Sequence, residues 1–151
     1  MVGEGADARN ERVEDDGPVN RATDELCAGD VMTRKFVCVE PETTLGELAQ
    51  RMGEAATGSA LVIERGRLSG ILTSRDVLRA VAERAQPSEA RVREWMTPEP
   101  VTGSLELGTD EAARMMLAGG FHHLPVVEDD RPVGVVGLRS ALGVLQHGWG
   151  W

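Results

Sequence analysis

The amino-acid sequence predicts an α+β fold made of two pseudo-symmetric β-α-β-β-α repeats, and three observations lead to this prediction. Short motifs recur 64 residues apart, as Met32-Thr33 and Met96-Thr97 do. Apolar runs of strand length alternate with segments whose apolar residues have helical spacing. Neighbouring apolar runs are joined by short turns, as in a hairpin. A fixed period with matching punctuation is the mark of an internal repeat.

The same 64-residue period relates three further pairs of segments. They are 70–72 and 134–136, Met52 and Met116, and 62–63 and 126–127. We therefore expect two superposable units, about 24–85 and 88–146, each a small sheet with helices on one face, stacked about a pseudo-twofold axis. The corresponding division of the chain is an acidic tail at 1–21, a first repeat at 22–86, a second repeat at 87–146 and a C-terminal tail at 147–151.

In the first repeat the helix after Thr44 has the clearest signal. Thr44 and Glu47 have the spacing of a capping box, and Leu45, Leu48 and Met52 follow at positions that share one helical face. The expected elements, in order, are a helix from Thr23, a strand at 37–39, the helix after Thr44, a hairpin of strands 60–63 and 68–73, and a helix from Ser74 that stops before Pro87.

The second repeat follows the same order. Its central helix should begin at Thr109-Asp110, turn Ala112, Met116 and Leu117 inward, and close at Gly119-Gly120. The expected elements are a linking helix capped by Ser88, a poor strand near Val101, the helix from Thr109, a hairpin of strands 124–127 and 132–137, and a last helix holding Leu138, Ala141, Leu142 and Leu145.

Composition limits the classes of partner. The 151-residue chain has a net charge of −9, which argues against nucleic acid or an anionic membrane surface. No apolar run approaches a membrane span, and the N-terminus lacks the apolar core of a signal peptide. Only Cys27 and Cys38 are present, so no disulfide framework is required and the cytoplasm is the expected location. A bond between these two cysteines is left open.

The two ends of the chain differ from the rest in composition. Residues 1–21 are acidic with sparse apolar residues, so they cannot bury enough surface to offset the entropy of ordering and should form a solvated tail. The segment 147–151 contains Trp149 and Trp151 and is too short to place. Terminal tryptophans of this kind can pack on a partner subunit.

The stretch 70–76 is the end of a strand that turns into the start of a helix, with Thr73 and Asp76 three residues apart at the turn. A helix start offers unpaired N–H groups and a partial positive charge, which suit a phosphate or a ribose. The alternative is a capping box, in which Thr73 or Ser74 caps the helix and Asp76 reaches back. The stretch alone leaves both interpretations open.

Taken together, the motifs resemble those of a tandem pair of cystathionine-β-synthase (CBS) domains, often called a Bateman module. The resemblance covers about residues 24–146 and depends on order, spacing and repetition. The matching residues are Asp30-Val31-Met32-Thr33, Gly70-Ile71-Leu72-Thr73-Ser74-Arg75-Asp76, Met96-Thr97, His123-Leu124-Pro125-Val126-Val127 and Gly134-Val135-Val136.

The resemblance implies an adenosine-containing ligand in the cleft between the repeats. Asp76 would hold the ribose hydroxyls through its two oxygens, Thr73 would assist, and a phosphate would meet basic residues of the partner repeat. The positions implied as ligand-binding are Thr73, Asp76, Ile71, Val101, His122, His123 and Arg139. The histidines have a plain alternative as imidazoles beside a buried strand, and Arg139 as a solvated helix residue.

The second repeat departs from this pattern. Its equivalents of Thr73 and Asp76 are Gly137 and Ser140. Glycine has no side-chain donor, and a serine hydroxyl cannot hold a diol as a carboxylate does, so this cleft should be empty or weak. A slot that holds arginine in some relatives is Gly58 here, which weakens the case for a highly charged ligand such as ATP.

Two functions of different class follow. The first is a regulatory sensor that binds AMP, ADP or ATP, or S-adenosylmethionine, and acts through an unknown effector protein. The second is a structural dimerisation module that has lost ligand binding. A homodimer is expected in either case, because helix faces with Leu78, Val81, Leu142 and Leu145 are only partly covered by the chain itself.

An enzyme is not expected. The sequence has no H-E-x-x-H zinc pattern, no G-x-S-x-G elbow, no P-loop and no dinucleotide fingerprint. We therefore expect no catalytic residues, no metal ligands and no required cofactor, and an adenine nucleotide as the ligand.

Overall fold

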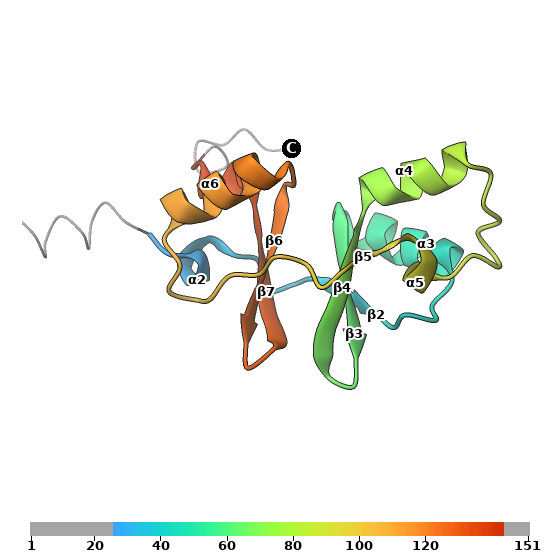
Figure 1. Cartoon of the computed structure of the whole chain (residues 1–151), viewed down its shortest axis with the longest axis horizontal. Coiled ribbons are helices and arrows are strands. Elements are labelled where there is room, and N and C mark those ends of the chain that lie inside the picture. The colour runs from blue at the N-terminus through green and yellow to red at the C-terminus, as the bar shows by residue number, and fades with distance from the viewer. Residues whose placement is uncertain (1–25, 144–151) are drawn as a thin grey trace, which may run out of the picture.

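A computed structural model describes residues 26–143 of the chain. The predictions for the tails at 1–21 and 147–151, for the helix start at Thr23 and for Leu145 lie outside these residues. Two lobes stand side by side, and each turns a hairpin toward the other, with its helices on the outer and upper sides (Figure 1). The facing hairpins are β3 (Ser59–Glu64) with β4 (Arg67–Thr73), and β6 (His123–Glu128) with β7 (Arg131–Gly137). The predicted α+β class is confirmed.

The first repeat contains a four-stranded sheet in the order β2-β3-β4-β5. Strand β2 (Val37–Val39) runs parallel to β3, and the short strand β5 (Thr97–Pro98) adds to the other edge. Helix α3 (Leu45–Ala55) starts as predicted, since the hydroxyl of Thr44 accepts a hydrogen bond of 3.2 Å from the Glu47 N–H. Helix α4 (Ser74–Ala82) follows β4 directly and ends before Pro87.

The second repeat has the same hairpin with a smaller sheet. Strands β6 and β7 form a two-stranded sheet, flanked by α6 (Thr109–Gly119) and α7 (Leu138–Ala141). Both hairpins carry a register irregularity at the same place, between Val62 and Ile63 and between Val126 and Val127. The poor strand predicted near Val101 forms only one isolated bridge, from Gly103 to Val126. Glycine is depleted in strands because it has no side chain to pack.

The short leading helices exchange places between the repeats. Helix α2 (Ala28–Val31) precedes the first repeat, but Ala28 and Met32 belong to the second core. Helix α5 (Val92–Trp95) precedes the second repeat, but Val92 lies in the first core. The segment that leads into each repeat therefore packs on the other repeat first. It also adds a contact to an edge strand of that repeat: Thr33 pairs with Val135 on β7, and Thr97 pairs with Ile71 on β4.

Two glycines make this exchange possible. A Cβ atom at Gly70 would lie 2.6 Å from the Met96 sulfur and 3.0 Å from the Thr97 carbonyl oxygen. A Cβ atom at Gly134 would collide with Met32 and lie 3.0 Å from the Thr33 carbonyl oxygen. Such distances are too short for any side chain, so only glycine lets the Met-Thr segment cross the strand. The repeated Met-Thr and Gly motifs are thus two sides of one contact.

Two local predictions are wrong. The linking helix is not capped by Ser88, since residues 86–90 form turns and α5 begins only after Arg91. Leu117 does not point inward; 61% of it is exposed.

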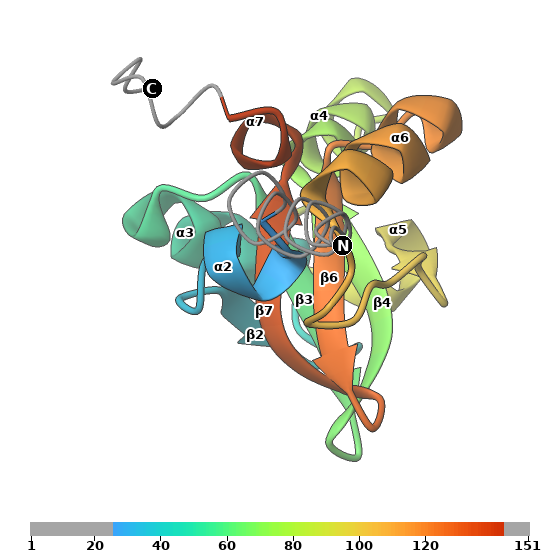
Figure 2. The same cartoon turned by 90° about the vertical axis from the view of Figure 1, so that its left-hand side faces the viewer.

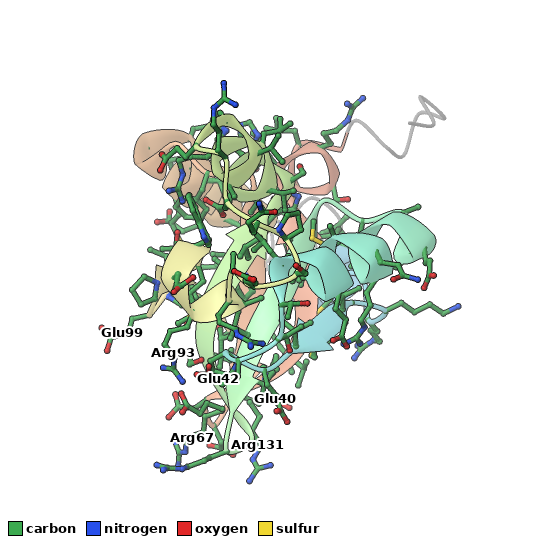
Figure 3. The ribbon with its side chains drawn as sticks, turned by 90° about the vertical axis from the view of Figure 1, so that its right-hand side faces the viewer. Glu40, Glu42, Arg67, Arg93, Glu99 and Arg131 are labelled. Carbon is green, nitrogen blue, oxygen red and sulfur yellow. The ribbon has the colours of Figure 1, made fainter. Side chains whose placement is uncertain are left out.

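The tips of the two hairpins contact each other. The Leu68 N–H donates to the Asp130 carbonyl oxygen over 3.0 Å, and Arg67 forms an ion pair with the Asp130 carboxylate. Figure 3 places Arg67 and Arg131 next to each other at this end, below the ion pair of Arg93 with Glu42. The 64-residue period makes Arg131 the equivalent of Arg67, and Gly66 the equivalent of Asp130. Arg131 therefore faces a glycine where Arg67 faces a carboxylate, and only the ion pair of Arg67 with Asp130 is made.

An apolar surface remains on the opposite side of the molecule. Helices α4, α6 and α7 lie together along one side (Figure 2), and they carry exposed apolar side chains at Leu78, Val81, Leu117 and Leu142. Cys27 and Cys38 are both free, and burial raises the pKa of the Cys38 thiol. Within residues 26–143 no helix has the length and apolar character needed to cross a membrane.

Candidate functional site in the cleft between the repeats

A cleft of ≈ 440 Å³ lies between the two repeats. This volume falls within the range of small-molecule sites. Six of the seven ligand-binding residues predicted from the sequence line it: Ile71, Thr73, Asp76, Val101, His122 and His123. The first three come from β4 and α4 of the first repeat, and the others from the second repeat, so the cleft exists only because the two repeats face each other.

Thr73 and Asp76 are placed by the turn from β4 into α4. Thr73 is the N-cap of the helix, with extended backbone at φ −118° and ψ 170°. One carboxylate oxygen of Asp76, Oδ2, accepts from the Thr73 N–H over 2.9 Å and from the Thr73 hydroxyl over 3.2 Å. The capping box considered from the sequence therefore forms, and it fixes the carboxylate at the wall of the cleft.

The other oxygen of Asp76 is engaged by an arginine one turn further along α4. Arg79 Nη2 donates to Oδ1 over 3.1 Å. The Asp76 side chain is 16% exposed and that of Arg79 is 49% exposed. The ligand-free cleft thus presents a carboxylate that already has a cationic partner.

His122 and His123 stand at the start of β6, on the opposite wall. His122 is exposed, whereas His123 is half-buried. Burial of the imidazole lowers the pKa of His123, and the neighbouring His122 lowers it further. Its Nε2 atom would lie 3.4 Å from a Cβ atom at Gly58, so His123 reaches across to the first repeat. An anion in the cleft would find two imidazoles whose ring N–H groups can donate to it.

Arg139 is the predicted residue that is not among those lining this cleft. It lies on α7, beside Ser140, and has a partner within the chain. The residue that the structure does bring into the cleft is Arg75, in the first turn of α4. Arg75 and Arg139 are 64 residues apart, so the repeat period pointed to Arg75 as the arginine on the side of Thr73 and Asp76.

The glycine pair at the end of α6 lies in the wall of the cleft, which no pattern in the sequence indicated. Gly119, Gly120 and Phe121 line the cleft together. Gly120 has φ +73°, the left-handed conformation of a helix C-cap. A Cβ atom at Gly119 would overlap the Phe121 ring. The pair was interpreted as a helix stop, which is correct, but the same lack of side chains also lets backbone form the wall of the cleft.

A second cleft of ≈ 330 Å³ lies at the positions related by the 64-residue period. Gly137 and Ser140 take the places of Thr73 and Asp76, and Val135 takes that of Ile71. No side-chain cap is formed at the start of α7. His123 lines this cleft as well as the first, so one imidazole forms part of both walls.

Within the part of the chain that the structure describes, no three histidine, cysteine, aspartate or glutamate side chains come together in a way that could hold a metal ion. The side chains that line the first cleft offer a carboxylate that can accept from hydroxyls, an arginine and two imidazoles that can donate to an anion, and apolar walls from Ile71 and Val101.

A family model of the CBS domain matches the chain twice, at residues 28–83 and 92–147. The chain belongs to the CBS domain family, as a tandem pair. The CBS domain-containing protein YhcV of Bacillus subtilis is 31% identical to it over 109 residues, which are 72% of this chain and 78% of that protein.

Two solved structures with bound nucleosides or nucleotides share the fold. The CBS domain protein PAE2072 from Pyrobaculum aerophilum, complexed with AMP, has a TM-score of 0.72 at 22% identity and covers 81% of this chain and 97% of its own. The CBS domain pair of protein MJ0100, in complex with 5′-methylthioadenosine and S-adenosyl-L-methionine, has a TM-score of 0.73 at 23% identity and covers 82% of this chain and 98% of its own. At these identities the likeness shows the fold alone.

Proposed function

We propose that the protein is a regulatory module that binds an adenosine-containing ligand in the cleft of Thr73 and Asp76 and acts through a partner protein. The observation that carries the proposal is the meeting, in one cleft, of the Asp76 carboxylate from one repeat with His122 and His123 from the other. A carboxylate accepts from the two hydroxyls of a ribose, and the cationic groups suit a phosphate.

The charge of the cleft favours a monophosphate over the other candidates. Arg75 brings one guanidinium to the cleft, and His122 and His123 bring imidazole N–H groups that can donate to phosphate oxygens. This set suits AMP better than S-adenosylmethionine, whose sulfonium is itself positive. The same set provides too few positive groups for the three phosphates of ATP, and Gly58 adds no charge. The complexes of PAE2072 with AMP and of MJ0100 with 5′-methylthioadenosine and S-adenosyl-L-methionine support an adenosine ligand in a pair of this kind.

Isothermal titration with adenosine, AMP, ATP and S-adenosylmethionine tests this proposal. AMP should bind more tightly than adenosine, because the phosphate adds charge-assisted hydrogen bonds. Arg75→Met should remove most of that difference and leave the binding of adenosine itself unchanged. Equal binding of AMP and adenosine by the parent protein would contradict the role given to Arg75, and no binding of any of the four compounds would contradict the sensor function.

The second candidate function is a structural dimerisation module. The apolar surface of α4, α6 and α7 favours it, because Leu78, Val81, Leu117 and Leu142 are each more than half exposed. A homodimer through this face is also part of the sensor proposal. Light scattering at micromolar concentration should give the mass of a dimer, and Leu78→Glu/Leu142→Glu should give that of a monomer; a monomeric or larger parent protein would contradict the proposal.

We further propose that the protein acts on another protein by recognition. We expect no catalysis, because the cleft holds groups for recognition and a module of this kind acts by changing how it meets another protein. The effector is an unidentified protein, and the cytoplasm stays the expected location.

A further inference from the structure

The Asp76 carboxylate has little acceptor capacity left in the ligand-free cleft. An ionised carboxylate offers about four acceptor positions. The Thr73 N–H and hydroxyl take two of them on Oδ2, and Arg79 Nη2 takes one on Oδ1. A ribose diol brings two hydroxyls, so one of the three present donors must leave before both hydroxyls can be held.

Arg79 is the donor that leaves at the lowest cost. The Thr73 N–H is fixed in the backbone, and both Thr73 donors belong to the capping box that starts α4. Arg79 makes a single hydrogen bond to Asp76, through a side chain that is 49% exposed. Ion pairs of such exposure contribute little, because solvent screens them and the long side chain loses entropy when held.

Arg79 also contacts the segment that leads into the second repeat. The same Nη2 atom donates to the Trp95 carbonyl oxygen over 3.3 Å, and the guanidinium carbon lies 5.0 Å from the centroid of the Trp95 ring, within reach of a cation–π contact. Trp95 is the last residue of α5, two residues before β5, and Thr97 in that strand lines the cleft. One guanidinium thus joins the carboxylate of the first repeat to the connection between the repeats.

We propose that Arg79 competes with the ribose for Asp76, and that its displacement changes its contact with Trp95. This inference rests on the proposed function, since it describes what happens when that cleft fills. Occupancy of the cleft is then transmitted to the connection between α5 and β5 by one side chain that moves between two partners. Arg79 is accordingly an internal inhibitor of its own site.

The affinity test uses adenosine, which has no phosphate and therefore reports the ribose contact without the anion site. Arg79→Met keeps the length and apolar stem of the side chain and removes the donors. It should bind adenosine about twofold to fivefold more tightly than the parent, as expected for loss of a weak competing ion pair. Arg114→Met, which removes an arginine of an exposed ion pair with Glu111 on α6 and lies outside the cleft lining, should leave adenosine binding unchanged. Weaker or equal binding by Arg79→Met would show that Arg79 positions Asp76 instead of competing for it.

Fluorescence tests the link to Trp95. The chain has three tryptophans, so Trp149→Phe/Trp151→Phe leaves Trp95 as the sole indole. In this background adenosine should change the emission of Trp95, and Arg79→Met should bind adenosine without that change. Asp76→Asn should alter the emission with no ligand present, because it removes the ionic partner of Arg79. Ser140→Ala, at the equivalent position of α7, should not.

The results separate the two ideas. If adenosine binds the parent but the emission of Asp76→Asn equals that of the parent, the competition is wrong and the proposed function stands. If adenosine binds neither the parent nor Arg79→Met, the proposed function fails and the competition fails with it.

Discussion

The two clefts have the same backbone and different chemistry. At the start of α4 and at the start of α7 the N-cap residue is extended, with ψ of 170° and 153°. At the first of these starts a threonine and a carboxylate form a cap at the wall of the cleft, whereas at the second a glycine and a serine form none. Because the fold is repeated, it forms two equivalent clefts, and the side chains in each cleft decide whether that cleft can hold a ligand.

The largest difference is expected from removing the carboxylate. Asp76→Ala should lower the affinity for adenosine about tenfold to a hundredfold, because a hydrogen bond to a charged acceptor contributes about 1.5–3 kcal/mol and each tenfold is about 1.4 kcal/mol. Ser140→Ala should change the affinity little. Isothermal titration checks both, and should give about one ligand per chain. Two equal sites, or equal losses in the two variants, would show that the ribose is held in the other cleft.

The two repeats should be alike in their need for glycine at positions 70 and 134. Gly70→Ala and Gly134→Ala each force a Cβ atom against a methionine and a backbone carbonyl oxygen. Because a packed methionine side chain must move and a carbonyl oxygen must give way in both cases, each variant should lose about 1–3 kcal/mol of stability. Thermal unfolding measures this, with Gly53→Ala as the control, since a Cβ atom there meets nothing within 4 Å. A large loss in only one of the two would mean that the exchange of the leading helices is not symmetric.

A graft should make the clefts alike in chemistry too. A Cβ atom at Gly137 meets nothing within 4 Å, so Gly137→Thr/Ser140→Asp can rebuild the capping box of α4 at α7 without a clash. We expect the second cleft of this variant to bind adenosine about tenfold more tightly than the second cleft of the parent protein does, and more weakly than the Asp76 cleft does. Titration should show about two ligands per chain, with Gly137→Thr alone as the control. A stoichiometry that stays at one would mean that the second cleft lacks more than these two side chains.

The smallest effect comes from His123, which both clefts share. Burial and His122 lower its pKa in the folded protein from the ordinary 6.5. Below about pH 6.5 the unfolded chain therefore takes up a proton that the folded chain resists, and stability falls as the pH decreases toward the lowered pKa. His123→Asn should lack this part of the acid sensitivity, seen as a difference of a few degrees at most in Tm between pH 7 and 5. Parallel pH profiles for the two proteins would contradict this.

The fold could be predicted from the sequence because the internal repeat gave two copies of the evidence for each element. Each motif of the first half has a partner 64 residues later, so an error in one element would have broken the match in the other. The boundary that failed, the start of α5, lies in a four-residue helix whose position is set by contacts with the opposite repeat. No local pattern in the sequence reports such a contact.

Six of the seven residues that the sequence indicated as ligand-binding line the first cleft. Thr73 and Asp76 could be predicted because a strand end followed by a helix start is a local feature. Arg75 was missed because the resemblance pointed to Arg139, and which of two equivalent arginines faces a given cleft depends on how the repeats are oriented. Arg79 could not be found from the sequence either, since its role depends on Trp95, sixteen residues away in a segment that returns to the first core.

The exchange of α2 and α5 decides what unit of this protein can exist by itself. A chain cut at Pro87 would keep α2 with no second core to receive it, and would leave the edge of β4 without the pairing of Ile71 with Thr97. An open strand edge invites aggregation. The pair should therefore unfold in one cooperative transition, with no stable half. The side chains of the two clefts can therefore differ, as Asp76 and Ser140 do, while the fold that carries them holds together only as a pair.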